Sequence, residues 1–296
     1  MNYEEQRLTL SVDEGRILDV ALTGPVGEQT LIFHGGTPSA PMTYEPFSRA
    51  AAERGIQLVQ YARPGYCAST RQPARTVGDC AADVAAIADQ LGAERILVAG
   101  WSGGGPHALA TAALLPERVA AAATIAAVAP WDAKGLDWLG GMGKENVEEF
   151  AAALAGPEEL QSWLEAWAPA MSVVTGAEVA ESLGDLVADV DRAALTGEFA
   201  ESLAAAFRGA VAEGIWGWFD DDLAFTREWG FALESIEVPL TLWQGGQDRM
   251  VPFAHGEWLA EHIPGAKASL LQEHGHLSIA AASFGEVLDD LLASAT

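Results

Sequence analysis

The chain has 296 residues, of which 50% are hydrophobic, enough to bury one large domain or a core with a smaller insertion. Its 42 acidic and 16 basic residues give a formal net charge of −26, which argues against nucleic acid or an anionic membrane as a partner. No apolar run approaches the length that a membrane-spanning helix needs.

Two features indicate the compartment. Cys67 and Cys80 are too few for a disulfide framework or a cysteine metal site, and they fit a reducing cytoplasm. The first six residues are polar and acidic, with no basic segment followed by an apolar one, so we expect no secretory signal. We therefore expect a cytoplasmic monomer or homodimer that acts on a small-molecule substrate and contacts neither nucleic acid nor membrane.

Strand and helix patterns alternate over the first part of the chain. Two alternating segments on either side of Asp13-Glu14-Gly15 predict an antiparallel hairpin. Short apolar runs then predict strands, and amphipathic stretches predict helices. The expected strands are 30–33, 56–61, 96–99 and 119–127, and the expected helices are 42–54, 77–91 and 103–115.

The pattern changes over residues 131–230 and then returns. This segment has helical spacing throughout, seven of the ten tryptophans, and 20 acidic against five basic residues. Alternation resumes with strands at 238–243 and 268–271 and helices at 253–262 and 277–293. We expect an α/β core from residues 1–130 and 231–296, with a mostly parallel sheet, helices on both faces, and an all-helical insertion.

Residues 100–104, Gly-Trp-Ser-Gly-Gly, follow the apolar run of the 96–99 strand and precede a helix. This G-x-S-x-G pattern is typical of a sharp strand-to-helix turn that exposes a serine hydroxyl. Gly100 and Gly104 leave room where strand and helix pass closely. Ser102 is therefore the candidate nucleophile.

A nucleophilic serine needs a base and an orienting acid, and we look for them in loops that follow predicted strands. Asp248 is the acid of the loop after the 238–243 strand. The loop after the 268–271 strand contains His274 and His276. His276 precedes a helix, and Gly275 beside it frees the backbone to aim the ring; we favour His276 on this ground and on the family resemblance given below. The order Ser102, Asp248, His276 suits such a triad.

The developing oxyanion needs two backbone N–H donors. Gly103 directly follows the nucleophile at a helix N-terminus, where the dipole also helps. The second donor should come from His34-Gly35-Gly36-Thr37-Pro38, and Gly36 is preferred because it has no Cβ.

Other chemistries find little support in the sequence. No H-E-x-x-H motif, paired C-x-x-C motif, phosphate loop or dinucleotide fingerprint is present, so we expect no metal and no cofactor. We interpret Asp220-Asp221-Asp222 as an acidic helix start or surface loop, with the alternative that an acid there lines the pocket.

These motifs together resemble the α/β-hydrolases. The matching pieces cover nearly the whole core and are His34-Gly35-Gly36-Thr37-Pro38, Arg63-Pro64-Gly65-Tyr66, Gly100-Trp101-Ser102-Gly103-Gly104-Gly105, Gly245-Gly246-Gln247-Asp248, Val251-Pro252 and Gly275-His276. The resemblance implies the α/β-hydrolase fold, a triad of Ser102, Asp248 and His276, and a helical cap at 131–230 that covers the crevice.

The function we expect is a carboxylesterase-like serine hydrolase for a small, fairly apolar ester, acting beneath the tryptophan-rich insertion. One alternative is an aminopeptidase or amidase of the proline-iminopeptidase-like kind, in which the acids Glu145, Glu148, Glu149 and Asp220–Asp222 would hold a cationic amine. Carbon–carbon bond hydrolysis uses the same triad. A non-catalytic ligand-binding member of the fold is the alternative outside enzymes.

Overall fold

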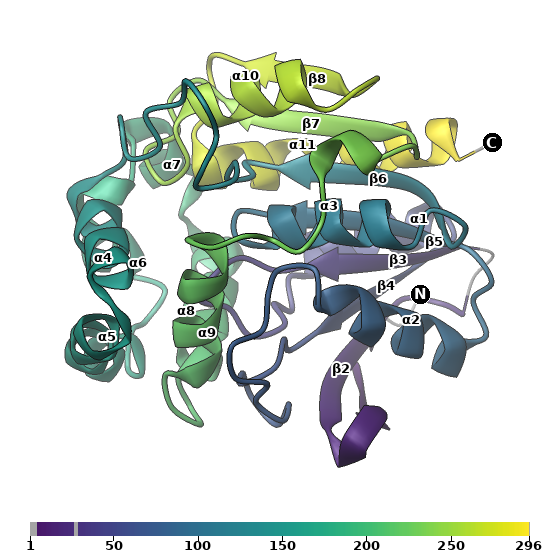
Figure 1. Cartoon of the computed structure of the whole chain (residues 1–296), viewed down its shortest axis with the longest axis horizontal. Coiled ribbons are helices and arrows are strands. Elements are labelled where there is room, and N and C mark those ends of the chain that lie inside the picture. Colours follow the sequence, from purple (N-terminus) through teal and green to yellow (C-terminus); the bar gives the residue numbers. More distant parts are fainter. Residues whose placement is uncertain (1–4, 27–28, 296) are drawn as a thin grey trace.

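The computed structural model describes residues 5–26 and 29–295, so most of the N-terminal segment behind the secretory expectation lies outside the described residues. Its centre is a twisted eight-stranded sheet in the order β1-β2-β4-β3-β5-β6-β7-β8 (Figure 1). The strands are β1 (Gln6–Ser11), β2 (Ile17–Thr23), β3 (Gln29–His34), β4 (Ile56–Tyr61), β5 (Ile96–Trp101), β6 (Val119–Ile125), β7 (Leu240–Gly245) and β8 (Lys267–Leu271).

The sheet is parallel except at one edge. The β1–β2 hairpin is antiparallel and β2 pairs antiparallel with β4, while β4, β3, β5, β6, β7 and β8 run parallel to one another. The central strands read as apolar runs because both of their faces are buried, as every residue of β4, β5 and β6 is. Parallel strands bring their carboxyl ends to one edge, which is where the candidate site lies.

Helices cover both faces of this sheet, as expected. On one face α1 (Glu45–Glu53) packs beside α11 (His276–Ser294), with Phe47 and Phe284 stacked 3.9 Å apart between ring centroids. The other face is covered by α2 (Cys80–Leu91), α3 (Gly104–Leu114) and α10 (Phe253–His262). The α1 and α2 helices begin three residues later than the sequence pattern predicts.

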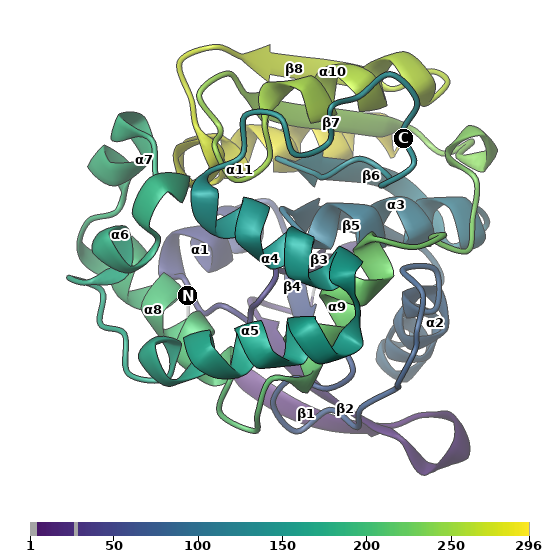
Figure 2. The same ribbon diagram turned by 60° about the vertical axis from the view of Figure 1, so that its left-hand side comes forward.

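All helices from α4 to α9 lie between β6 and β7 in the chain, and we call them the inserted helices. They gather at the side of the molecule where the parallel strands end, with α4 and α5 in front of that edge in Figure 2. Their bounds are α4 (Lys144–Ala155), α5 (Pro157–Met171), α6 (Val179–Ser182), α7 (Asp189–Ala194), α8 (Gly197–Ala210) and α9 (Trp216–Phe225). The domain limits at 130 and 231 stay a prediction.

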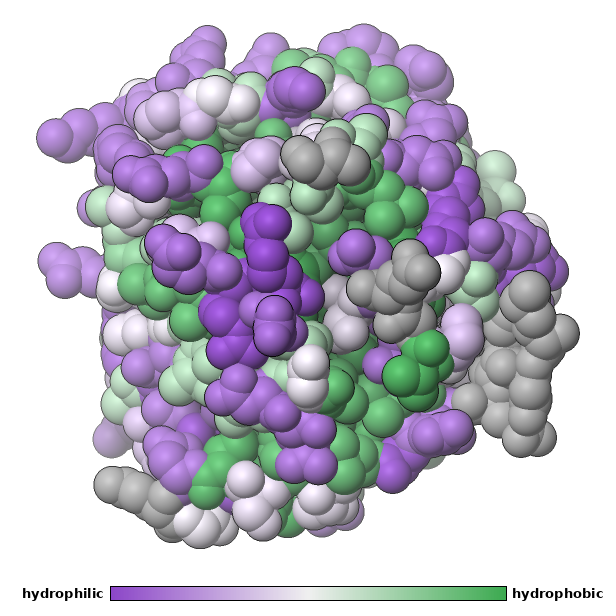
Figure 3. Space-filling view, turned by 90° about the vertical axis from the view of Figure 1, so that its right-hand side faces the viewer, coloured by the Kyte–Doolittle hydropathy of each residue, from purple (hydrophilic) through white to green (hydrophobic). Residues whose placement is uncertain are grey.

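Across residues 5–26 and 29–295, no helix has both the length and the apolar character that crossing a membrane requires. The face of the molecule opposite the inserted helices carries hydrophilic side chains that interrupt the hydrophobic ones (Figure 3).

Candidate active site

Ser102 lies at a tight turn between β5 and α3. Its φ is +57°, a left-handed conformation that a non-glycine residue adopts only under strain. A Cβ on Gly100 would lie 2.1 Å from the Gly104 carbonyl oxygen, and one on Gly104 would lie 2.0 Å from the His34 carbonyl oxygen. The backbone of this elbow therefore requires glycine at both positions. At Gly100 the reason is the close approach of strand and helix that the motif predicts, and at Gly104 it is the end of the neighbouring strand β3.

His276 and Asp248 meet at the carboxyl ends of β8 and β7. His276 begins α11, and its Nδ1 lies 2.8 Å from Asp248 Oδ2, with both side chains buried. Burial lowers the pKa of His276, but the Asp248 carboxylate outweighs that effect and the pKa is raised overall. His274 is half-exposed, and the described structure records no hydrogen bond from its ring.

Backbone amides hold the Asp248 carboxylate in place. Oδ1 accepts hydrogen bonds from the N–H groups of Met250 at 2.9 Å and Val251 at 2.8 Å, while Oδ2 faces the imidazole and also accepts from Gln244 Nε2 at 3.1 Å. Burial nevertheless dominates and raises the pKa of Asp248, against the lowering effect of His276. This arrangement fixes the ring so that Nε2 is the free nitrogen.

Asp191 is a residue that the sequence gives no reason to single out. It lies on α7, is fully buried, and accepts the backbone N–H groups of His276, Leu277 and Ser278 at 2.8–3.0 Å. Those are the orphan N–H groups at the start of α11, so Asp191 caps this helix from a distant segment. It thereby fixes the backbone that carries the imidazole.

The two glycines expected to form an oxyanion hole flank Ser102. A Cβ on Gly36 would lie 3.4 Å from the Ser102 Cβ, and Gly103 is the residue next to Ser102 at the start of α3. Within residues 5–26 and 29–295, neither Gly36 nor Gly103 donates its backbone N–H to another residue, and the Ser102 hydroxyl makes no hydrogen bond.

A cavity of about 270 Å³ contains both Ser102 and His276. Its walls come from the loop after β3, from α4, α5 and α8, and from the start of α11. Of the seven tryptophans in 131–230, Trp163, Trp167 and Trp218 line it, and the remaining four do not. Trp101 also lines it, and its indole N–H donates to the His276 carbonyl at 3.2 Å.

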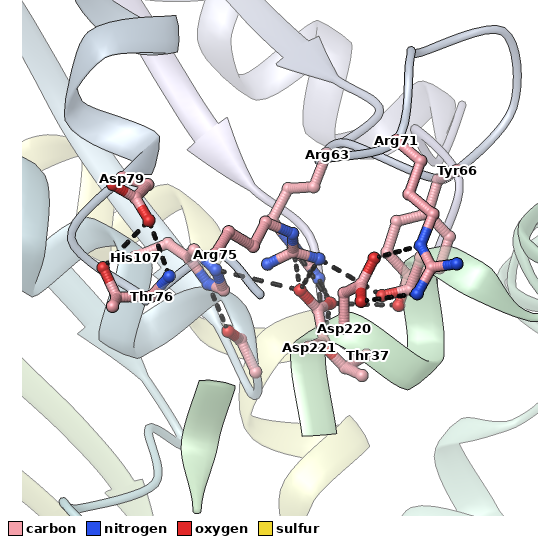
Figure 4. Close-up of polar contacts among 12 residues, drawn as sticks. Thr37, Arg63, Tyr66, Arg71, Arg75, Thr76, Asp79, His107, Asp220 and Asp221 are labelled. Carbon is pink, nitrogen blue, oxygen red and sulfur yellow. Dashed lines mark hydrogen bonds and ion pairs between the residues drawn. The ribbon is translucent and has the colours of Figure 1, made fainter. Parts of the chain in front are cut away.

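The interpretation of Asp220, Asp221 and Asp222 as a helix start or surface loop is wrong. All three lie inside α9 and are at most 3% exposed. Successive residues of a helix point about 100° apart, and here the three carboxylates reach different partners. Asp220 pairs with Arg71 at 2.7 Å, and Asp221 pairs with Arg63 and Arg75, each at 2.6 Å (Figure 4).

Asp222 faces a second, smaller cavity of about 40 Å³, which also touches Ser102, Gly103 and Glu149. No described residue is recorded as donating a hydrogen bond to either oxygen of Asp222. Burial and the neighbouring Glu149 carboxyl raise the pKa of Asp222 well above its ordinary value. Trp218 Nε1 donates to Glu149 Oε1 at 2.6 Å. Burial raises the pKa of Glu149 to about 7, and two adjacent carboxyls must share a proton.

Comparisons with known proteins agree with this architecture. The family model described as "alpha/beta hydrolase fold" matches residues 31–280. The chain is 25% identical over 276 residues to the uncharacterized hydrolase YcgS of Bacillus subtilis (strain 168), covering 92% of this chain and 93% of that one.

Solved structures with different names share the fold. A hydrolase from Pseudomonas aeruginosa matches with a TM-score of 0.70 at 20% identity, over 97% of this chain and 98% of that one. The esterase RhEst1 from Rhodococcus sp. ECU1013 matches with a TM-score of 0.64 at 20% identity, over 98% and 99%. A bromoperoxidase from Bacillus anthracis matches with a TM-score of 0.68 at 21% identity, over 97% of this chain and 100% of that one. This chain belongs to the α/β-hydrolase fold family.

Proposed function

We propose that the protein is a serine hydrolase that forms an acyl-enzyme with a small, fairly apolar ester and needs no cofactor. The observation that carries this proposal is the buried His276–Asp248 pair, 2.8 Å apart, in a site whose cavity also contains Ser102. The strained elbow at Ser102 and the free amides of Gly36 and Gly103 support the same reading.

The roles follow from the chemistry of each group. His276 Nε2 removes the proton of Ser102 as the hydroxyl oxygen attacks the ester carbonyl, and then protonates the departing alcohol. Asp248 holds the ring tautomer and stabilises the imidazolium. The N–H groups of Gly36 and Gly103 stabilise the oxyanion of each tetrahedral intermediate. Water activated by His276 then hydrolyses the acyl-enzyme.

The substrate class rests on the cavity walls. Indole, thioether and aliphatic side chains make up most of the lining, which suits an alkyl or aryl group. The name of the Rhodococcus neighbour, an esterase, is consistent with this assignment.

The direct test is covalent labelling with a fluorophosphonate probe together with turnover of p-nitrophenyl esters of graded chain length. We expect the wild-type chain to label and to hydrolyse short esters, and Ser102→Ala to do neither. His276→Ala should abolish turnover, whereas the matched His274→Ala should retain it. A wild-type chain that is not labelled and not active would favour the ligand-binding alternative instead.

A second candidate function is hydrolysis of amides that carry a primary amine. The supporting observation is the Glu149–Asp222 pair in the small cavity beside Ser102, which could exchange its shared proton for an ammonium group. Asp220 and Asp221 are already neutralised by arginines and offer no such site. Turnover of aminoacyl-naphthylamides without turnover of the nitrophenyl esters would favour this candidate.

For location and assembly we propose a cytoplasmic monomer or homodimer that meets only small-molecule substrates. The free thiols of Cys67 and Cys80 support a reducing compartment. Fractionation of the source cells and light scattering of the purified protein test these proposals.

A further inference from the structure

A buried cluster of charged residues contacts Thr37 of the loop that follows β3 (Figure 4). Its centre is Asp221 of α9, which is fully buried. Its carboxylate accepts hydrogen bonds from Arg63 and Arg75 at 2.6 Å, from Tyr66 at 3.0 Å and from Thr37 at 2.7 Å. Burial alone would raise the pKa of Asp221, but the two guanidinium groups hold it well below its ordinary value. The carboxylate therefore stays charged.

Arg63 connects this carboxylate to the backbone of the loop. Its Nη1 donates to the Gly35 carbonyl oxygen and its Nη2 to the Gly36 carbonyl oxygen, both at 2.7 Å. The Gly35 carbonyl and the Gly36 N–H belong to one planar trans peptide group and point in opposite directions. Holding that oxygen on Arg63 therefore sets the direction of the Gly36 N–H, the first donor of the proposed oxyanion hole.

Thr37 connects the same carboxylate to the second donor. Its hydroxyl donates to Asp221 at 2.7 Å and accepts from Arg63 at 2.9 Å. A Cβ on Gly103 would lie 2.4 Å from this hydroxyl oxygen, so Thr37 packs directly on the backbone of Gly103. One buried carboxylate thus reaches both sides of the proposed hole through two neighbours.

We propose that Asp221 is a positioning residue for the oxyanion hole, acting through Arg63 and Thr37. The proposal rests on the proposed function, because it assigns a purpose to the Gly36 and Gly103 donors. The inserted helices would then contribute to catalysis as well as line the cavity. A carboxylate on α9 would align the transition-state donors of the core.

The sharpest test is Thr37→Val, which keeps the shape of the side chain and leaves the Arg63–Asp221 pair intact. With a nitrophenyl ester we expect kcat to fall about tenfold and KM to change less than about twofold. Losing a whole oxyanion donor lowers kcat by about 10²–10³-fold, and misaligning a donor should cost less. Thr37→Ser, which restores the hydroxyl, should recover most of the rate. Thr226→Val is the matched control, because its hydroxyl near the end of α9 bonds only backbone oxygens.

A binding measurement separates positioning from a general structural effect. An alkylboronic acid forms a tetrahedral adduct on a nucleophilic serine, whereas the product carboxylate does not. Thr37→Val should weaken boronate binding by the same factor as kcat and leave product binding unchanged. Arg63→Lys keeps a positive charge near Asp221 but cannot donate to both the Gly35 and the Gly36 carbonyl oxygens. Its kcat and its affinity for the boronate should fall at least as much as those of Thr37→Val.

Two negative outcomes are distinguishable. A wild-type chain that neither reacts with fluorophosphonate nor hydrolyses esters overturns the proposed function. An active wild type, with a folded Thr37→Val variant whose kcat and boronate affinity are unchanged, overturns the positioning role alone. A loss confined to KM has the same consequence. The Thr37→Val result decides by itself, whether or not Arg63→Lys folds.

Discussion

The Glu149–Asp222 carboxyl pair beside Ser102 predicts that the free energy of unfolding falls as the pH rises toward neutral. Glu149 has a pKa of about 7 in the folded chain against an ordinary value of 4.5, because burial disfavours its charged form. Below pH 4.5 the group is protonated in both states. As the pH rises toward 7, the unfolded chain releases this proton while the folded chain keeps it, so the free energy of unfolding falls.

The magnitude follows from the two pKa values. Their difference corresponds to about 3 kcal/mol of lost stability, most of it between pH 5 and pH 8. Glu149→Gln removes the carboxyl that titrates near neutral pH, and its amide can still accept from Trp218 and donate to Asp222. The variant should therefore match the wild type closely in acid and exceed it in stability at pH 8.

Urea unfolding at pH 5 and pH 8 measures this directly. Glu148→Gln is the matched control, because Glu148 is the preceding residue of α4 but is exposed, with only an i,i+4 ion pair to Lys144 at 3.3 Å. The quantity of interest is the difference in unfolding free energy between variant and wild type at each pH. If that difference for Glu149→Gln is the same at both pH values within about 0.5 kcal/mol, the buried protonated pair does not exist.

Three further predictions concern the elbow, the base and the cavity. Asp248→Asn should lower kcat by about 10⁴-fold. It should also move the acid limb of the pH–rate profile to lower pH, because Asp248 contributes more than Asp191 to the raised pKa of His276. Gly100→Ala should lower the free energy of unfolding in urea by at least about 3 kcal/mol, since its Cβ would lie 2.1 Å from a carbonyl oxygen of α3. The control Gly285→Ala, inside α11, should instead raise the free energy of unfolding by up to about 1 kcal/mol. Trp163→Ala should shift ester preference toward longer acyl chains by at least about tenfold in relative kcat/KM.

Each has an outcome that contradicts it. An unchanged acid limb in Asp248→Asn would mean that another group controls the profile. A Gly100→Ala chain as stable as wild type would disprove the backbone clash at the elbow. An unaltered chain-length preference in Trp163→Ala would place the acyl group elsewhere in the cavity.

The parts of the site that sequence patterns located are those whose geometry is local. A serine between two glycines at a strand–helix junction implies a strained elbow, because the Cβ that Gly100 lacks would clash with Gly104, only four residues away. The clash at Gly104, by contrast, is with His34 at the end of β3. Asp248 and His276 could be proposed because each follows a predicted strand, and parallel strands end at one edge. The sheet itself was predictable from alternation and apolar runs for the same reason.

The sequence by itself therefore determined the fold class and a short set of candidate residues. Only the tertiary structure decided where the acids of 131–230 act: Asp191 caps α11, Asp221 meets two arginines that follow β4, and Asp222 meets Glu149. Helical periodicity predicts which side of a helix is buried, but not which residues that side contacts. Those partners lie many residues away in the chain. Docking of the inserted helices on the core brings Asp191 to α11 and Asp221 to the two arginines, and packing of α9 on α4 brings Asp222 to Glu149.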